Sequence, residues 1–190
     1  MQQGEGSFWG FRLIFCLMPD SLTQYNQELA RCRQLFEAKF TDYGASWMAF
    51  RLPAITDQLY IKVKRVRTLE DTGENKVGES EHDEYTGLVN YGLIALMLAE
   101  RTRQGLKWED AATETRDRIM AQYDACAERC RALFQKKNHD YGEAWRSMRP
   151  SSYTDLILVK LLRIKQIENN RGQVTVSEGV EAGYCDIVNY

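Results

Sequence analysis

The sequence predicts an all-α fold, namely a pseudo-twofold helical bundle built from two tandem copies of a four-helix unit. Two observations lead to this prediction. The second half of the chain repeats the first half at an almost constant offset, and only three prolines interrupt long runs in which apolar residues recur at helical spacing. The 190 residues are 44% apolar and 27% charged, values that are typical of a soluble globular protein.

The repeat is clearest around the sequence Lys-x-x-Asp-Tyr-Gly-x-x-Trp, which we call the Asp-Tyr-Gly motif. This motif covers residues 39–47 and recurs 98 residues later at 137–145. After a one-residue insertion the offset becomes 99, and Val-Asn-Tyr at 89–91 then meets the same three residues at 188–190. An agreement of this length indicates an internal duplication.

Each copy is predicted to contain four helices in the same order. A long helix ends at the glycine of the Asp-Tyr-Gly motif, because Gly44 and Gly142 can adopt the left-handed conformation of many helix ends. A short helix carries the tryptophan, a third helix follows the break at Pro53 or Pro150, and a last helix follows a polar loop. Residues 174–176 could add a short extended stretch, but no sheet is predicted. The predicted ranges are about 20–40, 45–51, 54–71 and from 79 onward in the first copy, and about 109–138, 143–149, 152–169 and from 178 onward in the second.

The duplication divides the chain into an N-terminal extension at 1–17, a first copy at 18–105 and a second copy at 106–190. The extension is apolar but too short to span a bilayer, and it lacks the basic start and the cleavage site of a signal peptide. We expect it to be disordered or a spurious addition to a protein that begins at Met18; a membrane anchor is the alternative. The first copy continues past its Val-Asn-Tyr sequence and the second does not, so we expect the second copy to be C-terminally truncated.

The net charge and the cysteine content argue against a nucleic-acid-binding function and against a zinc site. A formal net charge of −2 gives no electrostatic reason to expect binding to a nucleic-acid backbone. Five cysteines without a Cys-x-x-Cys pair, together with two histidines, make a zinc site improbable. Cys126 and Cys130 are expected to be a buried thiol pair, which fits a reducing compartment and hence a cytoplasmic protein without a membrane partner.

The third helix carries two cations in a mostly apolar sequence. Lys160 and Arg163 lie three residues apart and thus on one helix face, and Lys62 and Arg65 repeat the pair in the first copy. A buried cation needs a partner. A phosphate or acid clamp inside the bundle would supply one, and a structural ion pair or exposure of the charged ends to solvent is the alternative.

The last helix of the second copy carries an acidic face. Glu178, Glu181 and Asp186 fall within one broad sector of that helix, and carboxylates in such an arrangement suit Mg²⁺ bridging to substrate phosphates. The first copy has His82 and Gly87 at two of these positions, so its acidic site is depleted and we expect any metal in the second copy. A solvated acidic face near a helix N-terminus is the alternative.

The Asp-Tyr-Gly motif itself gathers polar and aromatic groups twice. An aromatic side chain could stack on a base while the lysine and the aspartate contact phosphate or sugar; simple capping of the bundle by the aromatic rings is the alternative. The candidate residues are Lys137, Asp140, Tyr141 and Trp145, with first-copy counterparts Lys39, Asp42, Tyr43 and Trp47. The sequence contains neither a P-loop nor a dinucleotide-binding glycine motif nor a nucleophile elbow.

These motifs resemble the nucleotide modification associated domain 1 family, in two copies that span the chain from about residue 20 to its end. The family occurs in bacteria and phages, and the resemblance implies a part in making or handling modified nucleotides. It adds Arg149, Asp155 and Asn189, with counterparts Arg51, Asp57 and Asn90, to the candidate substrate-binding residues. The acidic last helix is also loosely similar to MazG-like all-α nucleoside triphosphate pyrophosphohydrolases, in which helix-borne carboxylates hold Mg²⁺, although their second acidic helix has no clear match here.

The sequence therefore predicts a nucleotide-handling protein whose partner is a nucleotide or modified nucleotide. One hypothesis is a Mg²⁺-dependent pyrophosphohydrolase-like enzyme linked to nucleotide modification. The alternative is a non-catalytic nucleotide-binding or helical assembly module, and a purely structural scaffold is the third. A homo-oligomer is compatible with each.

Overall fold

The computed structural model describes residues 20–76, 78, 80–175 and 179–190, so the predictions for residues 1–17 and Met18 lie outside the described residues. The described residues form six α-helices and three 3-10 helices, without a strand, which confirms the all-α prediction. The first copy comprises α2 (Ser21–Tyr43), η1 (Ser46–Ala49), α3 (Leu52–Thr72) and α4 (Glu81–Arg103). After η2 (Trp108–Thr113), the second copy comprises α5 (Arg116–Tyr141), η3 (Ala144–Ser147), α6 (Pro150–Asn169) and α7 (Val180–Asn189).

Three predicted helix starts were wrong. Pro53 and Pro150 lie in the first turn of α3 and α6 instead of before these helices. A proline is tolerated there because the first backbone N–H groups of a helix have no intrahelical acceptor. The long helix of the second copy starts at Arg116 and not near residue 109, since the Thr115 side chain accepts a hydrogen bond from the Arg118 N–H and caps the helix at that point.

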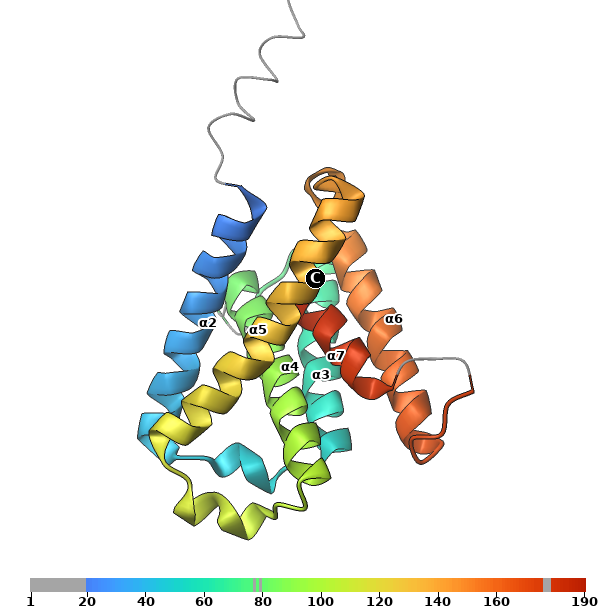
Figure 1. Ribbon diagram of the computed structural model, residues 1–190. Coiled ribbons are helices and arrows are strands. Elements are labelled where there is room, and N and C mark those ends of the chain that lie inside the picture. Colours follow the sequence, from blue (N-terminus) through green and yellow to red (C-terminus); the bar gives the residue numbers. More distant parts are fainter. Residues whose placement is uncertain (1–19, 77, 79, 176–178) are drawn as a thin grey trace, which may run out of the picture.

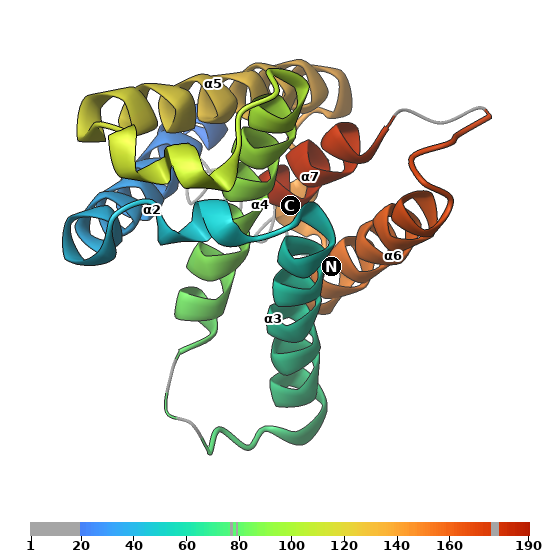
Figure 2. The ribbon, with the colours of Figure 1, turned by 90° about the horizontal axis from the view of Figure 1, so that it is seen from below.

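The helices pack as three layers of two. Figure 2 shows α2 and α5 on one side, α4 and α7 in the middle, and α3 and α6 on the other side. Each layer pairs one helix of the first copy with its counterpart in the second, as the duplication predicts. Figure 1 shows the helices from the side, with α4 and α7 between α2 at the left and α6 at the right. The two copies therefore share one core.

The middle layer forms the centre of that core. The run Leu93–Ala99 of α4 is buried at every position, as expected for a helix segment that is apolar on all sides. Its approach to α7 depends on Gly92, since a Cβ atom at this position would lie 2.8 Å from Cγ2 of Val188. A larger residue there would force the two central helices apart.

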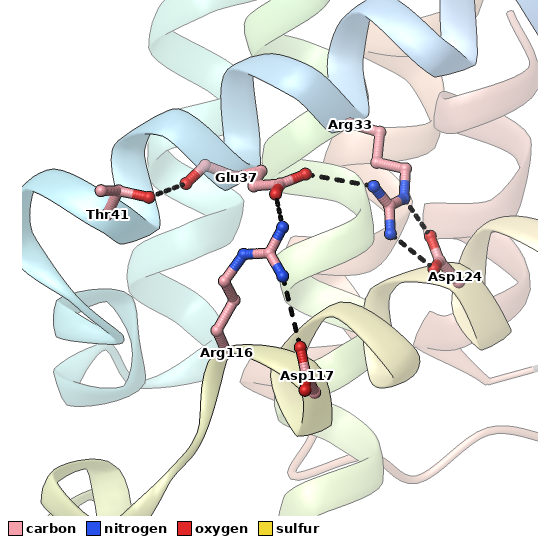
Figure 3. Close-up of polar contacts among 6 residues, drawn as sticks. All are labelled: Arg33, Glu37, Thr41, Arg116, Asp117 and Asp124. Atoms are coloured by element: carbon pink, nitrogen blue, oxygen red, sulfur yellow. Dashed lines mark hydrogen bonds and ion pairs between the residues drawn. The ribbon is translucent and has the colours of Figure 1, made fainter.

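Charged side chains join the outer surfaces of α2 and α5 (Figure 3). Arg33 makes a bidentate contact with Asp124, with nitrogen–oxygen distances of 2.7 Å and 2.9 Å. Glu37 accepts from Arg33 at 3.2 Å and also contacts Arg116. These groups are partly exposed, so each pair adds at most about 1 kcal/mol. The network fixes the register of α2 on α5 more than it stabilises the fold.

The cysteines of the described residues are reduced and buried, namely Cys32, Cys126, Cys130 and Cys185. The predicted burial of Cys126 and Cys130 is thus confirmed, but the sulfur 3.4 Å from Cys130 Sγ belongs to Cys185 on α7. None of the helices in the described ranges is both long and apolar enough to cross a membrane.

Candidate functional site

A pocket of about 300 Å³ opens in the first copy. Its walls come from the end of α2, from η1 and from α4, and one side chain of α3 closes it. Four residues of the Asp-Tyr-Gly motif line this pocket, and further aromatic rings surround them. The lining includes the aromatic residues Phe36, Phe40, Tyr43, Trp47, Phe50 and Tyr91 and the polar residues Lys39, Ser46, Lys62, Asp83 and Asn90.

The local sequence explains how the motif builds this wall. Lys39 and Tyr43 lie four residues apart on the last turns of α2, so their side chains share one face. Gly44 then ends the helix with a φ of 62° and a ψ of −151°, and its N–H donates to the carbonyl of Phe40 at 2.8 Å. This backbone conformation is strained for a residue with a side chain, and it turns η1 back so that Trp47 faces the core.

A buried carboxylate organises the charges beside the pocket. Glu84 of α4 is only 2% exposed, and its Oε2 accepts from Lys62 Nζ at 3.3 Å. Arg65 contacts the other carboxylate oxygen of Glu84. The predicted cation pair of the third helix therefore has an internal counter-charge in the first copy. Lys39 is exposed and forms no ion pair with any of the described residues.

The second copy places its carboxylate one helical turn later. Asp186 of α7 is buried and accepts from Lys137 Nζ and from Lys160 Nζ, both at 2.5 Å. Burial of Asp186 would raise the pKa of its carboxyl, but the two lysine contacts outweigh burial and lower it. Burial of Lys137 would lower the pKa of its ammonium group, but its contact with Asp186 outweighs burial and raises that pKa. The structural ion pair that was the alternative to a phosphate clamp is thus present at Lys160.

The two copies exchange a glycine and a carboxylate between these positions. Glu84 corresponds to Gly183, and Gly87 corresponds to Asp186. Each glycine leaves room for a neighbouring side chain, since an added Cβ would lie 2.6 Å from Lys62 Cε at Gly87 and 2.9 Å from two Ile164 carbons at Gly183. The repeat alignment contains this exchange, and it is the signal that could have identified Glu84 as a site residue.

Asn90 and Asn189 occupy equivalent positions in the two copies, and both make hydrogen bonds between the copies. Asn90 Nδ2 donates to the carbonyl of Cys32 at 3.1 Å, and Asn90 Oδ1 accepts from the hydroxyl of Tyr123 at 2.8 Å. The second copy repeats both bonds at 3.0 Å and 2.9 Å, with Asn189, the Cys130 carbonyl and Tyr25. Each asparagine therefore donates a hydrogen bond to the long helix of its own copy and accepts one from a tyrosine hydroxyl of the other copy.

The candidate aspartates Asp57 and Asp155 also link the two copies. Asp57 lies 2.6 Å from Lys165 Nζ, and Asp155 lies 3.5 Å from Arg67 Nη1. The four residues are equivalent in pairs under the 98-residue offset and lie along the contact of α3 with α6. Neither aspartate lines the pocket of the first copy.

The remaining candidates have separate environments. Asp42 and Arg51 are exposed in the first copy, as are Asp140, Tyr141 and Arg149 in the second, whereas Arg163 is half-buried on α6. The two tryptophans differ most. Trp145 Nε1 donates to Ser21 Oγ at 3.0 Å, whereas Trp47 is buried and its Nε1 has no hydrogen-bond partner among the described residues.

The predicted metal ligands contact cations. Glu181 lies 3.3 Å from Arg129 and 3.6 Å from Arg103, and Asp186 contacts its two lysines. Glu178 lies outside the described residues. Within the described part of the chain, no group of three metal-ligating side chains comes together. A Mg²⁺ site therefore stays a prediction, and it would require these carboxylates to exchange partners.

Comparison with known proteins agrees with the duplication. Neither the curated proteins nor the solved structures contain a match to the chain, and the looser similarity to MazG-like enzymes finds no support in them. The family model for nucleotide modification associated domain 1 matches residues 39–98 and again residues 137–190, which together are more than half of the chain. Both matches begin at the lysine of the Asp-Tyr-Gly motif. The chain therefore belongs to the nucleotide modification associated domain 1 family and carries that domain twice in tandem.

Proposed function

We propose that the protein binds a nucleotide in the pocket of the first copy. The observation that carries this proposal is the combination of aromatic walls with the ammonium groups of Lys39 and Lys62 in one cavity of about 300 Å³. This volume lies at the lower end of the roughly 300–1,000 Å³ found for small-molecule sites, and it suits a mononucleotide. The description of the family points to the same class of ligand.

The chemistry of the lining fits the two ends of such a ligand. The ring of Tyr43 is 57% exposed at the pocket and offers a face on which a base can stack. Phosphate oxygens would accept hydrogen bonds from the lysines, and bonds between charged groups are stronger than neutral ones. Asn90 already uses its amide in bonds to Cys32 and Tyr123, so it stiffens the wall and does not read the ligand.

Binding without turnover is better supported than catalysis. A pyrophosphohydrolase of the expected kind would hold Mg²⁺ on carboxylates, and Glu181 and Asp186 both contact cations here. Mg²⁺-dependent pyrophosphate release is therefore the second candidate function, favoured only by the placement of these two carboxylates on one short helix. The same ligands test both functions.

The experiment is a calorimetric titration of the full chain with canonical and modified mononucleotides and their triphosphates, with and without Mg²⁺, and with pyrophosphate release followed in parallel. Lys39→Met should weaken binding about tenfold, because one charge-assisted contact is lost. Lys137→Met is the matched control. It should leave the affinity within about twofold and lower the stability, since Asp186 loses one partner. Absence of binding by every nucleotide, or equal binding by Lys39→Met and the unmodified chain, would refute the proposal.

A further inference from the structure

The two copies of the domain carry the same pair of lysines with different counter-charges. Lys39 corresponds to Lys137, and Lys62 corresponds to Lys160. In the second copy, one carboxylate bridges the pair, with Oδ1 of Asp186 at 2.5 Å from Lys137 Nζ and Oδ2 at 2.5 Å from Lys160 Nζ. The two lysines of the second copy are therefore spaced to hold one group with two acidic oxygens.

The first copy lacks that carboxylate at the equivalent position. Position 87 is a glycine, and the pocket of about 300 Å³ is lined by Gly87 together with Lys39 and Lys62. Lys62 lies directly over this glycine, since an added Cβ would be 2.9 Å from its Nζ. An anion that lies against Gly87 would therefore meet the ammonium group of Lys62.

The buried carboxylate of the first copy, Glu84, does not bridge the two lysines as Asp186 does in the second copy. Glu84 lies one turn earlier on α4 and binds Lys62 and Arg65, whereas Lys39 has no ion-pair partner in the described ranges. The second copy has one carboxylate for its two lysines and the first copy leaves one lysine without a counter-charge beside a cavity. A ligand oxyanion would complete this arrangement, because it would accept charge-assisted hydrogen bonds from both lysines.

We propose that the first copy holds a phosphate group of the nucleotide between Lys39 and Lys62 against Gly87, and that Asp186 permanently occupies the corresponding position in the second copy. This inference rests on the proposed nucleotide site. It places the phosphate end of the ligand, and it limits each chain to one ligand although the domain is present twice. Asp186 acts as an internal substitute for the phosphate.

The test transfers the internal carboxylate to the first copy. Gly87→Asp adds a side chain whose Cβ has the flexible end of Lys62 as its nearest neighbour, so α4 is expected to fold. Gly87→Asn adds a side chain of the same shape without the charge. Calorimetry with the best-binding nucleotide and, separately, with inorganic pyrophosphate should give one ligand per unmodified chain. Both side chains displace the end of Lys62, but only the aspartate adds a competing charge. Affinity should therefore fall at least about tenfold in Gly87→Asp, and the fall in Gly87→Asn should be at least about threefold smaller.

The outcomes separate this inference from the proposed function. Two ligands per unmodified chain, or equal losses in the two variants at Gly87, would overturn the inference while leaving nucleotide binding intact. Failure of every nucleotide to bind the unmodified chain overturns the nucleotide proposal. Binding of pyrophosphate would then still support an anion site between Lys39 and Lys62, and its absence would overturn that site too. If Gly87→Asp does not fold, Asp186→Asn gives the reciprocal test. The number of bound pyrophosphates should rise from one to two, and a value that stays at one contradicts the role of Asp186.

Discussion

Replacement of Tyr123 by phenylalanine tests how the two copies are joined. Tyr123 belongs to α5 of the second copy and is fully buried, and its hydroxyl donates to Asn90 Oδ1 of the first copy at 2.8 Å. Burial also raises the pKa of Tyr123, so the hydroxyl stays protonated and remains a donor at neutral pH. Phenylalanine keeps the ring stacked on Phe36, whose centroid lies 4.6 Å away, and removes only the hydroxyl group.

The expected loss follows from the two groups affected. A net hydrogen bond contributes about 1 kcal/mol, and a buried acceptor left without a donor costs about 1–3 kcal/mol. Asn90 Oδ1 is such an acceptor because Asn90 is buried. We therefore expect Tyr123→Phe to lower the free energy of unfolding by about 2 kcal/mol. For a chain of this length, that corresponds to a fall in Tm of roughly 4–8 °C.

The measurement is urea and thermal unfolding followed by circular dichroism, in a double-mutant cycle with Asn90→Ala. In the Asn90→Ala background, Tyr123→Phe should cost little more, because its acceptor is already gone. The twin variant Tyr25→Phe should cost less than about 1 kcal/mol, since Asn189 is partly exposed and water can replace the donor. A change below about 0.5 kcal/mol for Tyr123→Phe, or equal effects in both backgrounds, would refute the reasoning.

Three further outcomes are expected. Gln122→Leu should raise the free energy of unfolding by about 1 kcal/mol, because Gln122 Oε1 is buried without a hydrogen-bond partner among the described residues. The equivalent change Gln24→Leu should lower that free energy by a similar amount, since Gln24 Oε1 accepts a hydrogen bond from Arg146 at 2.9 Å. Chemical denaturation that ranks the two variants in the opposite order would contradict this. Burial raises the pKa of Glu168 despite hydrogen bonds from the hydroxyls of Thr56 and Tyr184, so its contribution to stability is complete below the unfolded-state pKa near 4.5 and is lost as the pH rises through the folded-state pKa. Glu168→Gln should therefore flatten the decline of Tm above about pH 4.5, and an unchanged pH profile argues against it. Asp124→Asn should cost no more than about 1 kcal/mol at low salt and less in 0.5 M NaCl, a comparison that unfolding at two ionic strengths decides.

The sequence predicted the fold well where the information is local. Helical spacing, scarce proline and the glycines of the Asp-Tyr-Gly motif gave the order of helices, and Gly142 takes the expected left-handed conformation. The wrong helix starts at Pro53 and Pro150 concern less than one turn each, and the wrong start near residue 109 concerns about two turns; a proline or a threonine cap decides the first residue in each case. The pseudo-twofold arrangement followed from the duplication, whereas the packing of each helix against its counterpart was established by the structure.

The candidate site was predicted in part. The Asp-Tyr-Gly motif was expected to meet a ligand, and in the first copy four of its residues line a pocket. The acidic helix predicted a metal site in the second copy, where Asp186 instead contacts two lysines. Asn90 and Asn189 were assigned to ligand binding on a resemblance, and both hold the two copies together. Their recurrence in both copies reflects packing as much as chemistry.

The sequence by itself determined the helical class, the duplication and the residue types that each copy presents around its motif. Only the tertiary structure showed that the Asp-Tyr-Gly motif of the first copy lines a cavity. The two copies differ in whether position 87 or 186 carries a carboxylate next to lysines from two other helices, and Lys137 is 49 residues from Asp186 in the chain. Contacts over such distances depend on the packing of whole helices, which no local pattern of residues specifies.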